Sequence, residues 1–235
     1  MTYNVRGLQN KNKRIKIFNY IKEKNPIGIC LLQETHSDEN VYKSWQKEWG
    51  QSESFFNHGS SNARGTAILF TQDCNCKVLN HENDGTGRLQ LISIEHDAIK
   101  YLIVNIYNPN SETDQVPFLQ KVNDALKHFT DISEHNIIMG GDFNMYYDLK
   151  LDTVGGNPSL KTKSIAEIIK IKEAYDLCDI FRVRHPNTRR YTYRSKNPKL
   201  SRRLDHFLIA DSLQQSVDNL VILPTIEKCD HSPLL

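Results

Sequence analysis

Oxygen-rich polar side chains recur along this sequence, and each follows a short apolar segment. The residues are Asn4, Glu34, Tyr107, Asp142, Asn144, Asp205, Asp230 and His231. Carboxylate and amide oxygens dominate the set, whereas thiols and imidazoles are few. Oxygen donors of this kind are typical of sites that hold a hard divalent cation. The set therefore predicts a site for Mg²⁺, with Mn²⁺ as the alternative ion.

Each of these residues taken alone has an ordinary structural explanation. Glu34 could be solvated at the end of a strand, and Tyr107 could belong to the core with its hydroxyl at the surface. Asp142 and Asn144 could bond to their own backbone in a turn, and His231 could cap a loop. The functional interpretation depends on the occurrence of all of them, in this order, in one chain.

Short apolar segments alternate with amphipathic helices, and these elements must position the polar side chains. Helices are expected at residues 11–24, between Asp38 and Gly50, at residues 116–129 with Pro117 in the first turn, and at residues 164–175. Strands are expected at residues 27–32, 55–56, 66–70, 77–79, 89–94, 101–107, 136–139, 191–193, 203–209 and 220–223. Consecutive strands with short turns favour antiparallel pairing. The pattern predicts one domain over residues 1–235, with two layered sheets flanked by helices.

The charge of the chain is unevenly distributed. The net charge is only +2, from 30 Lys and Arg against 28 Asp and Glu, and this balance alone indicates no nucleic-acid partner. Residues 182–203 contain nine basic residues and no acidic one. The rest of the chain carries 21 basic and 28 acidic residues, a net charge of −7. The basic stretch is either a solvated, arginine-rich loop or a surface that contacts phosphate backbones.

Cysteine usage and hydropathy restrict the class of protein. The five cysteines are odd in number, and Cys74 and Cys76 form a lone C-x-C, so neither a disulfide framework nor a zinc site is expected. A reducing compartment fits this usage best. Mean hydropathy is −0.56, and no apolar run approaches the roughly 18 residues that span a bilayer. No signal peptide opens the sequence, so neither a membrane-embedded nor a secreted protein is expected.

The order of the polar motifs resembles that of the endonuclease/exonuclease/phosphatase superfamily. Its members share an Asn in the first strand, Q-E-T, Y-x-P-N, G-D-F-N, R-x-D and a terminal D-H. The matching residues are Asn4, Gln33-Glu34-Thr35, Tyr107-Asn108-Pro109-Asn110, Gly141-Asp142-Phe143-Asn144, Arg203-Leu204-Asp205 and Asp230-His231. The resemblance covers essentially the whole chain. It implies a four-layer α/β sandwich of two mixed, largely antiparallel sheets packed face to face between helices, with the strand after Pro233 cut short.

Within that superfamily the chain is most similar to the endonuclease domains of LINE-type (non-LTR) retrotransposons. Residues 32–36 resemble their L-Q-E-T-H, and residues 64–69 resemble their R-G-V-A-I-L. Residues 176–195 are similar to their D-L-x-D-x-W-R, H-P and Y-T-x-x-S. Abasic-site endonucleases usually carry Trp three residues before the Asp that matches Asp205, and this chain has Arg202 there. The resemblance therefore favours a retrotransposon endonuclease over an abasic-site enzyme.

The resemblance implies roles for the candidate residues in the hydrolysis of a phosphodiester. Glu34 is expected to be the main Mg²⁺ ligand, beside Asn4 and Asp230. Further candidate ligands of the ion are Asp142, Asn144 and His231.

The remaining roles concern the attacking water and the phosphate. Asp142 is expected to orient or deprotonate the water, and Asn144 to donate to the phosphate. His231 is expected to donate to a non-bridging oxygen, with Asp205 on its other ring nitrogen. Tyr107 is expected to bond the phosphate or assist the leaving group.

The same resemblance places a basic hairpin of residues 191–205 beside the active site, where it would enter the minor groove of DNA. The candidate DNA contacts are Arg64, Thr192, Arg194, Lys196, Lys199, Arg202 and Arg203. Contacts of this kind neutralise phosphates and position the duplex more than they read its sequence.

The resulting prediction is a Mg²⁺-dependent DNA endonuclease that nicks one strand of the target. The 3′-hydroxyl would prime reverse transcription by a reverse transcriptase domain of the same polyprotein. The expected partner is double-stranded DNA, the location is the nucleus, and the isolated domain is expected to be monomeric. Three alternatives stay open: an apurinic/apyrimidinic repair endonuclease, a phosphatase of inositol phosphates or sphingolipids, and a non-enzymatic DNA-binding module.

Overall fold

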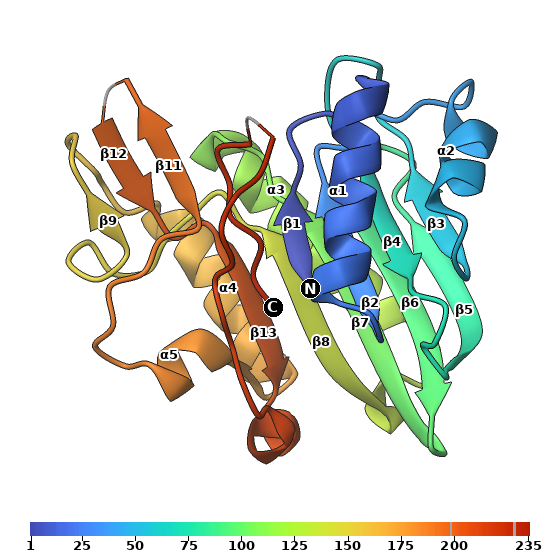
Figure 1. The fold of residues 1–235 in the computed structure, drawn as a ribbon. Helices are drawn as coiled ribbons and strands as arrows, with labels where there is room; N and C mark the ends of the chain where they lie inside the picture. Colours follow the sequence, from blue (N-terminus) through green and yellow to red (C-terminus); the bar gives the residue numbers. More distant parts are fainter. Residues whose placement is uncertain (198, 228) are drawn as a thin grey trace.

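Two mixed β-sheets form the centre of the computed structural model, which describes residues 1–197, 199–227 and 229–235 (Figure 1). The first sheet has the order β1-β2-β4-β3, and only its β1–β2 pair is parallel. Its strands are β1 (Thr2–Asn4), β2 (Ile29–Gln33), β3 (Ser54–Asn57) and β4 (Thr66–Phe70). Helices α1 (Lys11–Lys24) and α2 (Tyr42–Trp49) cover its outer face (Figure 1).

The second sheet has the order β10-β13-β8-β7-β6-β5, and its β7–β8 pair is parallel. In chain order its strands are β5 (Lys77–Asn83), β6 (Leu89–His96), β7 (Ile99–Tyr107), β8 (His135–Asp142), β10 (Leu177–Asp179) and β13 (Asp205–Ala210). Helices α3 (Glu112–His128) and α4 (Thr162–Ala174) pack on its outer face. The short α5 (Ile180–Arg184) follows β10 directly.

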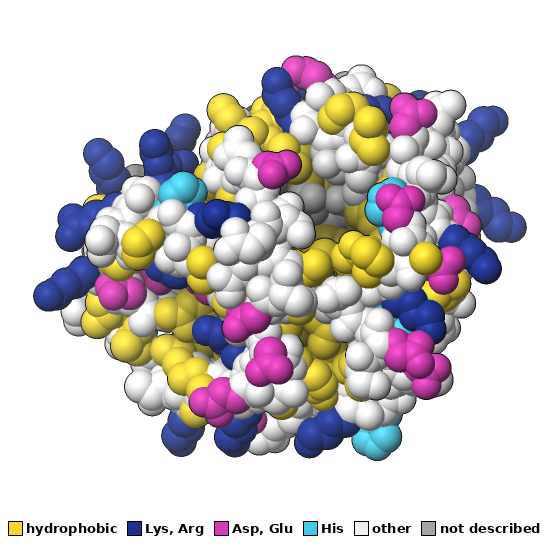
Figure 2. All heavy atoms as spheres, turned by 90° about the horizontal axis from the view of Figure 1, so that it is seen from below, with side chains coloured by type: hydrophobic (Ala, Val, Ile, Leu, Met, Phe, Trp, Pro, Cys, Tyr) yellow, Lys and Arg dark blue, Asp and Glu magenta, His cyan; other side chains and the backbone are white. Residues whose placement is uncertain are grey.

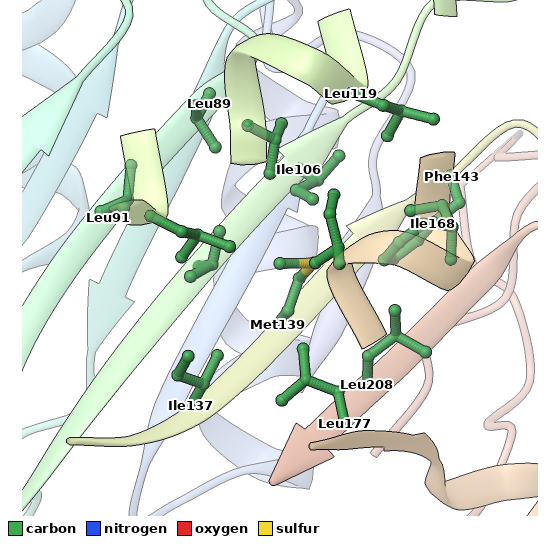
Figure 3. Close-up of a cluster of buried hydrophobic side chains, with 14 of the residues drawn as sticks. Leu89, Leu91, Ile106, Leu119, Ile137, Met139, Phe143, Ile168, Leu177 and Leu208 are labelled. Atoms are coloured by element: carbon green, nitrogen blue, oxygen red, sulfur yellow. The ribbon is translucent and has the colours of Figure 1, made fainter. Parts of the chain in front are cut away.

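Apolar side chains fill the space between these layers. Leu31 and Ile68 of the first sheet pack against Ile92 and Ile103 of the second sheet, which places the two sheets face to face. Figure 3 shows the cluster under α3 and α4, in which Met139 of β8 lies at the centre. Burial of each such side chain contributes roughly 1.5–3 kcal/mol. The expected α/β fold, with mixed sheets and flanking helices, is confirmed.

A third, small sheet with the order β11-β12-β9 lies beside the main sheets (Figure 1). Its strands are β9 (Thr153–Val154), β11 (Tyr193–Lys196) and β12 (Lys199–Arg202). Two predictions were wrong here, because residues 194–201 were expected to be a loop and the next strand was expected to begin at Arg203. The basic segment instead alternates exposed and partly buried side chains and pairs with itself as a hairpin. Pro198 lies outside the described residues.

Other element boundaries differ from the prediction for local reasons. Helix α3 begins at Glu112 instead of residue 116, because the Ser111 hydroxyl accepts from the amide of Asp114 and caps an earlier turn. Pro117 therefore lies inside the helix. Residues 220–223 form no full strand, and Ile222 makes only an isolated bridge to Leu234.

Strand β8 extends three residues beyond its predicted end and carries Asp142 as its last residue. Gly141 makes this possible because its φ is 151°, and an added Cβ would lie 2.0 Å from the carbonyl oxygen of Ile106. Gly140 and Gly141 were expected to follow this strand, but the structure places both of them within β8.

The two ends of the chain meet beside the first sheet (Figure 1). The amide of Thr2 donates to the carbonyl of Leu234 at 2.8 Å, and the amide of Leu234 donates back at 3.0 Å. All five cysteines carry free thiols. Within the described residues, no helix is long and apolar enough to cross a membrane.

Figure 2 shows the end of the molecule where hydrophobic side chains surround a hollow. This hollow of about 400 Å³ lies between the sheets, next to Ile29 at the start of β2 and Ile94 near the end of β6. The predicted site residues lie elsewhere, in a second and more polar pocket of about 380 Å³.

Candidate active site

Strand pairing brings the predicted site residues to one edge of the two sheets. In the parallel pair β1–β2, Asn4 stands opposite Gln33, so that Glu34 follows directly. In the parallel pair β7–β8, Tyr107 stands opposite Asp142. Parallel strands end at the same edge of a sheet. The polar residues that follow them in the sequence therefore become neighbours in space.

Residues from several separate segments of the sequence line the pocket at this edge. They are Asn4, Arg6, Glu34, Asn110, Asp142, Asn144, Tyr146, Lys161, Tyr193, Arg202, Leu204, Asp230 and His231. Two further predicted residues contact this set: Tyr107 donates to Glu34, and Asp205 bonds His231. All eight candidate catalytic residues are thus brought together.

His231 lies between two buried carboxylates. Its Nδ1 is 2.8 Å from Oδ2 of Asp205, and its Nε2 is 3.8 Å from Oδ2 of Asp142. Burial by itself would lower the pKa of His231, but the charges of Asp205 and Asp142 outweigh that effect and raise it well above its usual value. The imidazole is therefore held as a cation, and its Nε2 lies too far from Asp142 for a hydrogen bond between them.

Two amides hold the Asp142 carboxylate. Nδ2 of Asn4 donates to Oδ2 at 2.9 Å, and the backbone amide of Asn144 donates to Oδ1 at 2.9 Å. Asn144 adopts a left-handed conformation with φ 48°, which turns its amide back toward Asp142. Burial raises the pKa of Asp142, although the charge of His231 opposes this rise. A raised pKa suits a group that must accept a proton.

Glu34 lines the pocket, and Tyr107 lies behind it as its hydrogen-bond donor. Glu34 has φ 53°, and its carboxylate accepts a hydrogen bond from the Tyr107 hydroxyl. Burial and the charge of Glu34 raise the pKa of Tyr107, so the phenol keeps its proton at neutral pH. Arg88 stacks on the Tyr107 ring at 5.0 Å and donates to the Tyr107 carbonyl. The phenol is therefore fixed in position as a donor.

The donor chemistry of the pocket fits a hard divalent cation. Glu34 and Asp230 contribute carboxylates, and Asn4 contributes an amide oxygen that now accepts from the backbone of Arg6. Asp230 pairs with the Arg6 guanidinium at 3.0 Å and is 23% exposed, so it is open to exchange this partner for an ion. Residues Glu34, Asp230 and Asn4 are the set that would hold the metal.

Another group also has metal-compatible spacing. Asp142, Asp205 and His231 offer ligand atoms that lie within 4.8 Å of one another. The 2.8 Å contact with Asp205 and the raised pKa of His231 favour a protonated ring instead, and such a ring has no lone pair to donate. The geometry therefore favours a hydrogen-bonding role for His231 over metal ligation.

Two predicted DNA contacts were wrong, because both side chains are buried. The Thr192 hydroxyl is fully buried and accepts from the amides of Leu204 and Asp205, at 3.0 Å each. Arg203 is 1% exposed. Thr192 thus positions Asp205 and does not face a ligand.

Arg203 belongs to a buried ionic network. It donates to Asp152 at 2.8 Å and to Asp179 at 2.8 Å, and Arg182 also pairs with Asp152. The charges of Arg203 and Arg182 are therefore compensated inside the protein. The sequence offered no sign of this, because Asp152 and Asp179 lie outside the basic stretch.

The other predicted DNA contacts lie at the surface or on the pocket wall. Arg194, Lys196 and Lys199 are exposed on the β11–β12 hairpin, and Arg64 is exposed on the loop before β4. Arg202 lines the pocket, where it donates to the carbonyls of Val154 and Gly155 and lies over the ring of Tyr146. Their contact with DNA stays a prediction.

Backbone pairing attaches the hairpin to the catalytic loop. Tyr193 of β11 forms a bridge with His231, and the amide of Arg194 donates to the carbonyl of Asp230 at 2.8 Å. The amide of Ser232 donates to the carbonyl of Thr192 at 2.6 Å. The basic hairpin and the acidic pocket are therefore parts of one continuous surface.

Lys161 is a pocket residue that sequence reasoning missed. Its ammonium donates to the carbonyls of Asn110 and Asn144, at 2.6 Å each. Burial lowers its pKa, and the charge of Asp142 opposes this. No spacing rule marks a lysine just before a helix, so only the fold reveals its place. Tyr146 and Arg6 were missed for the same reason.

A comparison with known protein families identifies the family of this chain. The sequence profile described as "Endonuclease/Exonuclease/phosphatase family" matches residues 1–221. The chain belongs to this family. It is therefore a metal-dependent phosphodiesterase.

Two sequence relatives and one solved structure illustrate the relationship. The chain is 25% identical over 223 residues to the Transposon TX1 uncharacterized 149 kDa protein of Xenopus laevis, covering 94% of the chain and 16% of that protein. It is 23% identical over 266 residues to an exodeoxyribonuclease of Bacillus subtilis (strain 168), covering 100% of the chain and 96% of that protein. The fold is similar to that of an AP endonuclease from Archaeoglobus fulgidus, with a TM-score of 0.80, 20% identity, and 99% and 96% of the two chains covered.

Proposed function

We propose that the chain is the endonuclease domain of a LINE-type (non-LTR) retrotransposon, which nicks one strand of double-stranded DNA in the presence of Mg²⁺. The observation that carries the proposal is the attachment of the basic β11–β12 hairpin to the loop of Asp230 and His231. A positively charged hairpin there would track a phosphate backbone that passes over the pocket. The similarity to a transposon protein along 94% of the chain supports this context.

In this proposal Glu34, Asp230 and Asn4 hold the ion. The bound ion supplies Lewis-acid polarisation of the phosphoryl oxygens. Asp142 orients the attacking water and accepts its proton, and the amide of Asn144 and Nδ2 of Asn4 keep the carboxylate in place. The raised pKa of Asp142 makes its carboxylate a stronger base than that of an exposed aspartate.

His231 acts on the phosphoryl group from the other side. Asp205 binds Nδ1, so the proton on Nε2 remains available to a non-bridging oxygen as its negative charge develops. Nδ2 of Asn144 donates one N–H to the carbonyl of Asn108 and has a second N–H for the phosphate. The Tyr107 phenol donates its single O–H to Glu34 and so orients that carboxylate. Attack of the water on phosphorus forms a new P–O bond and breaks the P–O3′ bond, and the leaving 3′ oxygen takes a proton from solvent. The products are a 5′-phosphate and a 3′-hydroxyl.

The proposed partners follow from this product. The 3′-hydroxyl would serve as primer for a reverse transcriptase domain of the same polyprotein, acting on chromosomal DNA in the nucleus. The chain spans 16% of the transposon relative, which leaves ample length for such a domain in a protein of that kind. As an isolated domain the chain is proposed to act as a monomer.

Arg202 opposes the alternative of an abasic-site endonuclease. Its guanidinium is fixed against Val154, Gly155 and the Tyr146 ring on the pocket wall. A charged, hydrogen-bonded side chain is a poor wall for a flipped-out abasic sugar, for which an apolar surface is suited.

The test compares an intact supercoiled plasmid with a duplex that contains one abasic analogue. We expect Mg²⁺-dependent nicks in the plasmid, none with EDTA, and no preference for the abasic position. Cleavage confined to the abasic site would overturn the retrotransposon proposal in favour of an abasic-site repair endonuclease.

A second experiment tests the hairpin. Residues 194–201 are replaced with a Gly/Ser loop, and we expect altered nick positions with the same metal requirement. An unchanged pattern of nicks would argue against a targeting role for the hairpin.

A further inference from the structure

Lys161 is a half-buried cation in the pocket that no role assigned so far uses. It lies on the pocket wall together with Asp142, Asn144 and Asn110. Its ammonium donates to two main-chain carbonyls, those of Asn110 and Asn144, at 2.6 Å each. An ammonium has three N–H donors. One donor therefore remains for a ligand in the pocket.

The charge of Lys161 lacks a close counterion among the described residues. Within that part of the chain its hydrogen bonds go to neutral carbonyls alone, and the nearby Glu112 carboxylate accepts instead from the backbone amides of Lys163 and Ser164. Burial of a charge that is only partly compensated is costly, and burial lowers the pKa of this ammonium although the charges of Asp142 and Glu112 oppose that effect. An anion that enters the pocket would remove that cost.

The two carbonyls that Lys161 binds belong to the loops after β7 and β8. Asn144 follows Asp142, and its backbone amide holds the Asp142 carboxylate. Gln115 of α3 donates to the carbonyl of Pro109 at 2.6 Å and to that of Asn144 at 3.1 Å, so the loops are joined at a second point. The two hydrogen bonds of Lys161 therefore place its ammonium beside the loop that holds the Asp142 carboxylate.

We propose that Lys161 is a catalytic residue whose third N–H donates to a non-bridging oxygen of the phosphodiester under attack. This inference rests on the proposed function, because it needs a phosphodiester in the pocket. Its contribution is electrostatic and grows as charge develops on the phosphoryl oxygens. No bond to Lys161 forms or breaks.

The test uses Lys161→Met, because methionine has a side chain of similar length to lysine but no charge. The matched control is Lys163→Met. Lys163 is exposed two residues further along. Nicking is measured with a duplex that contains one mapped nick site. For Lys161→Met we expect kcat to fall on the order of 100-fold with KM changed less than about threefold. For Lys163→Met we expect neither constant to change.

A phosphorothioate at the scissile position distinguishes contact from a structural effect. If Lys161 donates to that oxygen, sulfur substitution slows the wild type by a larger factor than it slows Lys161→Met. Equal thio effects in both proteins, or a rise in KM with unchanged kcat, would overturn the proposal. Lys161→Arg guards against misfolding, because it keeps the cation and is expected to retain at least ten times the kcat of the methionine variant.

Failure of the proposed function gives a different result. A wild-type protein that nicks no DNA in Mg²⁺ would contradict the proposed function itself. A wild type that nicks DNA while Lys161→Met nicks at the same rate would contradict only the role of Lys161.

Discussion

Nδ1 of His231 lies 2.8 Å from Oδ2 of Asp205, and both side chains are buried. The carboxylate fixes the ring orientation and stabilises the imidazolium form, which leaves Nε2 facing the pocket. The raised pKa of His231 depends chiefly on this neighbour among the charges that raise it. The pair therefore controls the pH range over which His231 can donate.

Replacement of Asp205 with Asn is expected to narrow the pH range of activity from its alkaline side. In the wild type, His231 loses its proton only well above the ordinary value of about 6.5, so activity should persist at alkaline pH. In Asp205→Asn the attraction to the cation is lost, and the alkaline limb of kcat/KM should move toward neutral pH. A profile of nicking rate against pH, measured for both proteins, checks this. An alkaline limb at the same pH in both would contradict the role of Asp205.

Replacement of Arg203 with Met is expected to destabilise the fold rather than to weaken DNA binding alone. It leaves Asp179 buried without a guanidinium partner and leaves Asp152 with Arg182 alone. Removal of one partner of a buried pair typically costs about 3–5 kcal/mol. Urea unfolding provides the measurement. The exposed Arg194→Met serves as the control and should change the free energy of unfolding by less than about 0.5 kcal/mol. Equal stability of the two variants would refute the structural assignment.

The same network predicts how stability depends on pH. Burial alone would raise the pKa of Asp179 and Asp152, but hydrogen bonds and the charge of Arg203 hold both below their usual value. Because the folded-state pKa is the lower one, this stabilisation is fully present above the unfolded-state value of about 3.9 and is lost as the pH falls below it. The free energy of unfolding, measured at pH 7 and pH 3, should fall. We expect the free energy of unfolding of Arg203→Met to fall less between pH 7 and pH 3 than that of the wild type. An equal fall in both proteins would show that the network does not cause the pH dependence.

Removal of the three exposed charges of the hairpin is expected to weaken DNA binding in a salt-dependent way. For the triple variant Arg194→Ser, Lys196→Ser, Lys199→Ser, the slope of log K against log salt should fall by up to about 2.7, at roughly 0.9 per lost phosphate contact. A double variant, Lys43→Ser with Lys47→Ser, is the control, because α2 lies at the opposite end of the molecule (Figure 1). Binding isotherms at several salt concentrations give both slopes. Equal slopes would exclude the hairpin as a phosphate contact.

The sequence predicted the candidate site better than it predicted the elements around it. Asn4 and Glu34 come from the parallel pair β1–β2, and Asp142 ends β8 in the other sheet. The face-to-face packing of the two sheets then brings Asn4 within hydrogen-bond distance of Asp142. The hairpin was misjudged because its strands are short and polar on both faces, so that no apolar alternation marks them. Local capping by Ser111 moved the start of α3 in a way that the apolar pattern does not encode.

Charge counting failed where a charge had a distant partner. Arg203 and Thr192 looked like surface residues because the sequence does not show that Asp179 and the backbone of Asp205 face them. Lys161 was missed for the converse reason. Its partners are backbone carbonyls of two loops, and these are brought together only by the pairing of β7 with β8.

Nicking of a supercoiled plasmid by the wild type and by Asp142→Asn, in Mg²⁺, tests the central claim most directly. Because the amide keeps the shape of the side chain but cannot accept the proton of water, we expect the variant to be on the order of 100- to 1000-fold slower. The wild-type nicks should be extended by a DNA polymerase, which requires a 3′-hydroxyl. A variant that nicks at the wild-type rate, or wild-type nicks that no polymerase can extend, would contradict the account.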